Sequence, residues 1–150
     1  MELLDRPGQI FTFAAHLLLP RAATTLVRDA GPISFLMAAD ELPEVSAEEA
    51  NALVRGGAFL LDVREPDEWQ AGHAPEAIFL PIGQVEARID ELPRDRQIVT
   101  ICRVGGRSAA VVAALNTLGY DAVNVAGGMR AWEADDLPVV ADDGLPGAVI

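Results

Sequence analysis

Short apolar runs alternate with amphipathic stretches along the chain from residue 44 onward. The runs cover residues 58–63, 77–80, 98–101 and 122–125, and their length and composition are typical of strands buried in a parallel sheet. Between the later runs, hydrophobic residues recur at every third or fourth position, which indicates helices packed on one face. Because parallel strands need crossover connections, this alternation predicts an α/β domain whose sheet is covered by helices on both faces.

Local signals place the helices between these runs. Ser46 followed by Glu49 is a capping box, and Gly56 is positioned to end the helix that begins there. Pro66 suits the first turn of a short helix that Gly72 can end. Two further helices are predicted from apolar faces, one formed by Val85, Ile89 and Leu92 and the other by Val111, Val112, Leu115 and Leu118.

The first 39 residues precede the alternation of apolar runs and helices, and we predict that they form an N-terminal extension (1–39). Their apolar stretch at 10–19 has ten residues, whereas a helix that crosses a bilayer needs about 20. No basic region precedes this stretch, which disfavours a secretion signal, and Met37 is a candidate for the physiological start. We therefore expect a folded domain over 40–140 and an acidic, solvated C-terminal tail over 141–150.

Composition narrows the possible functions. The net charge of −12 disfavours partners such as nucleic acid or an anionic membrane, because this field repels phosphate groups. All eleven basic residues are arginine, so lysine chemistry is excluded. One cysteine and two histidines fall short of a structural zinc site, and one cysteine cannot form an internal disulfide. We expect a cytoplasmic protein with no metal and no cofactor, which works with one thiol, arginines, carboxylates and backbone dipoles.

The one cysteine, Cys102, directly follows the apolar run at 98–101 and begins the segment Cys-Arg-Val-Gly-Gly-Arg-Ser over 102–108. Ligands of open parallel sheets bind at the carboxyl ends of the strands, where this loop is expected. Two adjacent glycines let successive N–H groups turn inward as an anion-binding nest, and the next helix directs its positive end there. Because Arg103 and Arg107 add two charges, the loop favours the thiolate of Cys102 and predicts a nucleophile in a cradle for a small anion.

Two other interpretations of this loop stay open. A cysteine at the end of a strand is often only a small buried residue, although packing does not account for two arginines and two glycines beside it. A cysteine phosphatase or arsenate reductase has a similar layout, but the phosphatases use Cys-x5-Arg, whereas Cys102 and Arg107 form Cys-x4-Arg. The shorter loop suits a bound sulfur atom better than a phosphoryl group.

Four segments together carry a family resemblance, and they are Leu61-Asp62-Val63-Arg64-Glu65, Gly72-His73-Ala74-Pro75, the loop at 102–108 and Gly127-Gly128-Met129-Arg130-Ala131-Trp132. In their order and spacing they resemble the rhodanese family of sulfurtransferases, over about residues 42–138. The resemblance implies an open five-stranded parallel sheet with a short first strand near Val45, and a persulfide on Cys102. The chain departs from the family's usual Gly-His-Ile-x-Gly-Ala at Ala74 and Glu76.

We predict a two-step sulfur transfer on this basis. Cys102 takes sulfane sulfur from thiosulfate or a persulfide donor and passes it to a thiol or cyanide acceptor. Arg103 is expected to orient an anionic donor and Arg107 to shape the loop, while Asp62 pairs with an arginine or caps the loop and Arg64 meets the donor. The backbone groups expected to hold the sulfur are those of Arg103, Val104, Gly105, Gly106, Arg107 and Ser108.

A regulatory module that keeps a rhodanese shape without turnover is a third interpretation, although such modules often lack the nucleophile that Cys102 supplies here. We expect thiosulfate to bind weakly, because the body of the protein repels a dianion and only the two loop arginines act at contact distance. Gly106→Val is expected to damage the loop. Outside the loop, His73 is expected to hydrogen-bond within its own loop, and Trp69 and Trp132 to pack.

Overall fold

The computed structural model describes residues 41–150. Residues Leu42–Ile150 form one compact unit. The expectations for the N-terminal extension at 1–39 and for Met37 fall outside the described residues. Within 41–150, no helix combines the length and the apolar character needed to cross a membrane. Nor do the His, Cys, Asp and Glu side chains of this part of the chain form a group that could hold a metal ion.

Within residues 41–150, one sheet of five parallel strands forms in the order β1-β5-β4-β2-β3. Pairing of β2 with β4 runs from Phe59 opposite Ile98 to Asp62 opposite Ile101. The sheet is open, as predicted, and its short first strand includes Val45. The strands are β1 (Glu44–Val45), β2 (Phe59–Asp62), β3 (Ile78–Phe79), β4 (Ile98–Ile101) and β5 (Ala122–Val125).

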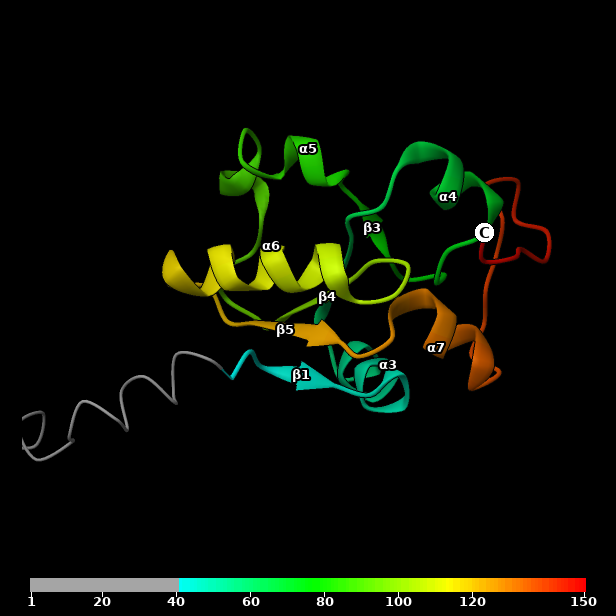
Figure 1. Cartoon of the computed structure of the whole chain (residues 1–150), viewed down its shortest axis with the longest axis horizontal. Coiled ribbons are helices and arrows are strands. Elements are labelled where there is room, and N and C mark those ends of the chain that lie inside the picture. Colours follow the sequence, from blue (N-terminus) through cyan, green and yellow to red (C-terminus); the bar gives the residue numbers. More distant parts are fainter. Residues whose placement is uncertain (1–40) are drawn as a thin grey trace, which may run out of the picture. The chain divides into compact units, whose positions relative to one another are not determined.

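Helices cover both faces of the sheet, as the alternating pattern predicts. Figure 1 shows α5 and α6 on one face and α3 and α7 on the other. The capping box that begins α3 is present, since Ser46 Oγ accepts from the Glu49 N–H at 3.1 Å and the Glu49 carboxylate accepts from the Ser46 N–H at 2.8 Å. The helices are α3 (Ala47–Arg55), α4 (Pro66–Ala71), α5 (Ile82–Val85), α6 (Gly106–Thr117) and α7 (Gly128–Ala134).

The helix predicted from Val85, Ile89 and Leu92 is interrupted. The α5 helix ends at Val85, and a separate 3-10 turn covers Ile89–Glu91. The Ile89 carbonyl accepts a hydrogen bond from the Tyr120 hydroxyl at 2.8 Å, and the following proline disfavours a helical conformation at Leu92. Val85 and Leu92 are nevertheless buried. The pattern therefore predicted the apolar face correctly, but the prediction of one continuous helix was wrong.

Alternation along the strands divides the core into two layers. Val99 and Ile101 of β4 pack in the layer of α3 and α7, where Trp132 is fully buried. Ile98 points to the opposite layer, beneath α6. Cys102 continues the alternation of Ile98 and therefore lies on the α6 side of the sheet, at its carboxyl edge.

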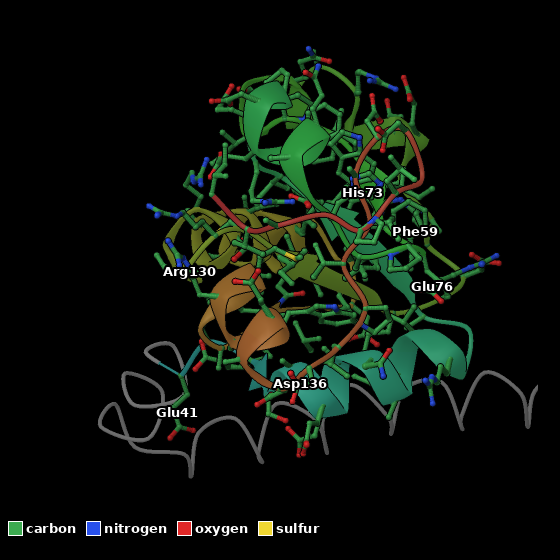
Figure 2. All side chains as sticks on the ribbon, turned by 90° about the vertical axis from the view of Figure 1, so that its right-hand side faces the viewer. Glu41, Phe59, His73, Glu76, Arg130 and Asp136 are labelled. Atoms are coloured by element: carbon green, nitrogen blue, oxygen red, sulfur yellow. The ribbon has the colours of Figure 1, made fainter. Side chains whose placement is uncertain are left out.

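The last residues of the chain cross between α4 and α7. Val140 pairs with His73, and the Ala148 N–H donates to the Ala71 carbonyl at 3.0 Å. The Val149 N–H donates to the Glu133 carboxylate at 3.2 Å, and the Val149 side chain is buried. Figure 2 shows His73 beside this red C-terminal segment. The segment thus joins two helices that begin at the carboxyl edge of the sheet.

Candidate active site

The loop after β4 holds Cys102 in a backbone conformation that depends on one glycine. Gly105 caps the N-terminus of α6 with φ +100°, in the left-handed region that favours glycine. Its N–H donates to Cys102 Sγ at 3.2 Å. Gly106 has no such φ and open space where a side chain would begin. Of the two adjacent glycines, Gly105 therefore has the conformation that requires glycine, and the damage expected from Gly106→Val stays a prediction.

The turn from β5 into α7 fixes the first residues of this loop. A Cβ on Gly128 would collide with the Cys102 carbonyl oxygen, so the two backbones approach as closely as glycine allows. The Met129 N–H donates to the Cys102 carbonyl at 2.8 Å, and the Arg130 N–H donates to the Arg103 carbonyl at 3.0 Å. The Gly127-Gly128 segment is thereby explained as a support for the cysteine.

Hydrogen bonds surround the sulfur of Cys102, which is 1% exposed. Ser108 Oγ lies 3.2 Å from Sγ. Burial raises the pKa of the Cys102 thiol, but hydrogen bonds from the Ser108 hydroxyl and from the backbone N–H groups of Ser108, Gly105 and Val104 lower it, and the net pKa is below its ordinary value. The site can therefore hold a thiolate, as expected.

Arg107 directs its guanidinium at a carboxylate of α4. Its two terminal nitrogens donate to the two oxygens of Glu68 at 2.7 and 2.8 Å. Hydrogen bonding to Arg107 is the main reason that the pKa of Glu68 is lowered, and Glu68 in turn raises the pKa of Arg107. Arg107 is therefore bound to Glu68 and is not held by the sulfur of Cys102, although a thiolate there would further favour its charged form.

Asp62 and Arg64, both named from the sequence, pair with each other at the end of β2. The Arg64 guanidinium donates to Asp62 Oδ2 at 2.7 Å and to the Gly72 carbonyl at 2.8 Å, and both side chains are 0% exposed. A buried pair of this kind ties β2 to the end of α4. It supports the helix that supplies Glu68.

Comparison with known proteins agrees with this geometry. The model of the rhodanese-like domain family matches residues 46–135. The chain belongs to the rhodanese-like domain family. Among its relatives, the chain is 42% identical over 87 residues to a protein named sulfurtransferase from Allochromatium vinosum, covering 57% of this chain and 81% of the relative.

A second relative is the thiosulfate sulfurtransferase GlpE of Pseudomonas syringae, 32% identical over 93 residues that cover 61% of this chain and 88% of GlpE. Among solved structures, a rhodanese-related protein from Thermoplasma volcanium matches with a TM-score of 0.64 and 34% identity. That match covers 67% of this chain and 99% of the other. The likeness therefore extends across almost the whole of the solved neighbour.

The remaining predicted residues occupy different parts of this rhodanese-like domain. Val104, at the tip of the loop, is 63% exposed, whereas Arg103 is half-buried. His73 is held by Trp69, with Nδ1 2.8 Å from the Trp69 carbonyl oxygen and its ring stacked on the Trp69 ring. Arg130, at the start of α7, is exposed (Figure 2).

Three side chains of the site were missed from the sequence. Glu68 holds Arg107, and Asn124 and Glu44 lie behind Ser108. Asn124 carried a signal, because it is the one polar residue in the apolar run 122–125. The signal for Glu68 was weaker, because it is only one of the acidic residues in the first turn of α4. Glu44 had no signal in the sequence, because its strand has only two residues.

Proposed function

We propose that this rhodanese-like domain is a sulfurtransferase that carries sulfur as a persulfide on Cys102. The observation that carries the proposal is the buried Sγ, which accepts hydrogen bonds within the loop that keep its pKa low. Family membership and relatives named sulfurtransferases support sulfur transfer in general. A low-pKa thiolate in a nest of N–H groups supports Cys102 as its carrier.

The proposed reaction has two steps. The Cys102 thiolate attacks the outer sulfur of thiosulfate, a new S–S bond forms, and the S–S bond of the donor breaks so that sulfite leaves with the electron pair. A thiolate or cyanide acceptor then attacks the outer sulfur of the persulfide. The bond to Sγ breaks with its electron pair on Sγ, which restores the thiolate. Because the chain has one cysteine, the acceptor must come from outside it.

The loop residues take different parts in this proposal. The N–H groups from Arg103 to Ser108 are the donors for the charged outer sulfur. Arg103, which is half-buried beside Cys102, orients an anionic donor. We assign Arg64 a supporting role with Asp62 instead of a contact with the donor, because its side chain has no exposed surface.

Charge at the site favours a persulfide donor over thiosulfate. Glu68 offsets the charge of Arg107, so one of the two loop arginines is largely neutralised, and the whole chain carries −12. A dianion such as thiosulfate gains little from this arrangement. We therefore propose that thiosulfate is used with a high KM and that a persulfide on another molecule is the better donor, in the cytoplasm, where thiol acceptors stay reduced.

The test is the mass of the protein after exposure to a donor. Incubation with thiosulfate should add one sulfur atom, cyanide should remove it as thiocyanate, and Cys102→Ser should add none. Cysteine persulfide, which carries one net negative charge at neutral pH, should load the wild type faster than the dianion thiosulfate does at equal concentration.

Absence of added sulfur with either donor would contradict transfer and support a non-catalytic module. Hydrolysis of an aryl phosphate that is lost in Cys102→Ser would instead support phosphatase chemistry.

A further inference from the structure

The hydroxyl of Ser108 lies between the sulfur and a buried amide. Ser108 Oγ is 3.2 Å from Cys102 Sγ and 2.6 Å from Asn124 Oδ1. Ser108 is 0% exposed and Asn124 is 1% exposed, so water does not supply other partners from the surface. The two contacts of Ser108 therefore compete inside the protein.

The orientation of the Asn124 amide follows from its other neighbours. Asn124 Nδ2 donates to Glu44 Oε2 at 2.8 Å and to the Gly105 carbonyl oxygen at 3.2 Å. A carboxylate and a carbonyl only accept hydrogen bonds, so the NH2 group must face them. The oxygen of the amide consequently faces Ser108 and can only accept.

A hydroxyl has one proton to donate, and here two acceptors face it. We propose that the Ser108 hydroxyl is a two-position donor, directed at Asn124 while Sγ is uncharged and at Sγ when Sγ is a thiolate. Ser108 is then a catalytic residue, because it touches the reacting sulfur. Asn124 is a positioning residue that acts through Ser108, and Glu44 sets the orientation of Asn124.

The proposal deepens the sulfur transfer proposed above, on which its catalytic part rests. In the persulfide, Sγ is bonded to carbon and sulfur, and the negative charge lies on the outer atom. When an acceptor takes that atom, the electron pair of the broken bond stays on Sγ. The Ser108 proton turns to Sγ at this moment and turns back to Asn124 when the next donor is attacked. Neither state leaves the buried proton without an acceptor.

Opposite effects of neighbouring residues follow from this competition. Asn124 stabilises the forms with an uncharged Sγ, which are the thiol and the persulfide, whereas the Ser108 hydroxyl stabilises the thiolate. Asn124→Leu should therefore raise the ionisation constant of the thiol and speed persulfide discharge, each about two- to tenfold, as expected for one net hydrogen bond. Ser108→Ala should lower the ionisation constant of the thiol and slow persulfide discharge, by similar factors.

The ionisation constant is measured from the pH dependence of the Cys102 alkylation rate, and discharge from single-turnover transfer to cyanide. The variants leave unchanged the charged groups beside Cys102, namely Arg103, Arg107 and its partner Glu68, whereas Asn124→Leu removes the hydrogen bond that Glu44 accepts from Asn124. Asn116→Leu is a matched control, because Asn116 also joins α6 to β5 through hydrogen bonds to Ala122 and has no contact with Ser108. It should leave both quantities unchanged.

The double variant Ser108→Ala/Asn124→Leu separates the route through the hydroxyl from the hydrogen bond that Asn124 donates to the Gly105 carbonyl. Because the proposal assigns the effect of Asn124 on Sγ to the hydroxyl, the double variant should titrate like Ser108→Ala. If Asn124→Leu does not fold, Asn124→Val replaces it with a residue that suits a strand.

A lowered ionisation constant in both single variants, or additive effects in the double variant, would overturn the proposal. Titration needs no sulfur donor. A wild type that gains no sulfur would contradict the sulfur transfer proposal alone. The opposite shifts of the ionisation constant in Ser108→Ala and Asn124→Leu would still be measurable and would still test the two-position donor.

Discussion

The ion pair between Glu68 and Arg107 allows a quantitative test of how charge is distributed beside Cys102. Glu68→Gln keeps the size of the side chain and one oxygen that can accept hydrogen bonds, but it removes the negative charge. One of the two hydrogen bonds of 2.7 and 2.8 Å is lost because the amide NH2 group cannot accept from Arg107, and the other no longer joins two opposite charges. Arg107 keeps its charge and loses its partner.

The cost in stability is modest because the pair is partly solvated. Side-chain exposure is 34% for Arg107 and 12% for Glu68. Hydrogen bonds to charged groups contribute about 1.5–3 kcal/mol when well shielded, and solvent screening at Arg107 reduces this. We expect Glu68→Gln to lower the free energy of unfolding by about 1 kcal/mol at neutral pH.

The pH dependence identifies the charge as the cause. Arg107 lowers the pKa of Glu68 in the folded protein, so the ion pair contributes stability that is complete above the pKa of an unfolded glutamate, about 4.3. This contribution is lost as the pH falls through the lower pKa of the folded state. Wild type and Glu68→Gln should therefore differ at pH 7 and converge at more acidic pH.

Urea unfolding of both proteins from pH 7 downward measures this convergence. Glu91→Gln is the matched control, since Glu91 pairs with Arg88 at 2.6 Å but both side chains are about half exposed, and we expect little change there. A difference for Glu68→Gln that stays constant into the acid range would show that packing, not charge, is responsible. Release of Arg107 should also raise kcat/KM for thiosulfate severalfold at low salt, and added salt should reduce that gain.

Two other substitutions test the backbone and the buried pair. Gly105→Ala forces a side chain into a left-handed φ of +100° and should cost about 1–2 kcal/mol of stability and slow alkylation of Cys102, whereas Gly106→Ala should change neither. Asp62→Asn leaves the Arg64 guanidinium buried without its counter-charge and should lower the free energy of unfolding by about 3–5 kcal/mol, measured by urea denaturation; a loss below 1 kcal/mol would contradict the buried pair.

The sheet was predictable because its signals are local and repeated. The apolar run at 98–101 coincides with β4 and the run at 122–125 with β5, and each is bounded by residues that end a strand. Strand β1 has two residues, and only the family resemblance predicted it, because a strand so short has no periodicity. The interruption of the helix predicted through Ile89 and Leu92 has a local signal in the proline that follows Leu92. The hydrogen bond from Tyr120 to the Ile89 carbonyl joins residues distant in sequence, and no local pattern contains it.

The site was predictable where its chemistry lies within one loop. The position of Cys102 after a buried strand, with glycines and arginines following, predicts a thiolate, and the hydrogen bonds around Sγ lower the pKa of the Cys102 thiol. Glu68 lies 39 residues before its partner Arg107, and Glu44 lies 80 residues before Asn124, so their roles depend on the crossover topology. Without strand order, the sequence offered no reason to connect them.

The balance of forces at Cys102 differs from the one that the loop sequence suggested. The loop sequence predicted three sources of thiolate stability, which are the backbone N–H groups, the positive end of the helix and the two arginines. In the structure Arg107 is paired with Glu68, and the hydrogen bonds of Ser108, Gly105 and Val104 lower the pKa of the Cys102 thiol. Hydrogen bonds to a buried atom are little affected by salt, whereas the attraction of partly exposed arginines is largely screened beyond about 8 Å at physiological ionic strength. A strongly acidic protein can therefore keep a reactive sulfur without a strongly positive site. With this arrangement we expect the ionisation of Cys102 to depend little on salt. We also expect the site to bind small dianions only weakly, because Glu68 offsets the charge of Arg107.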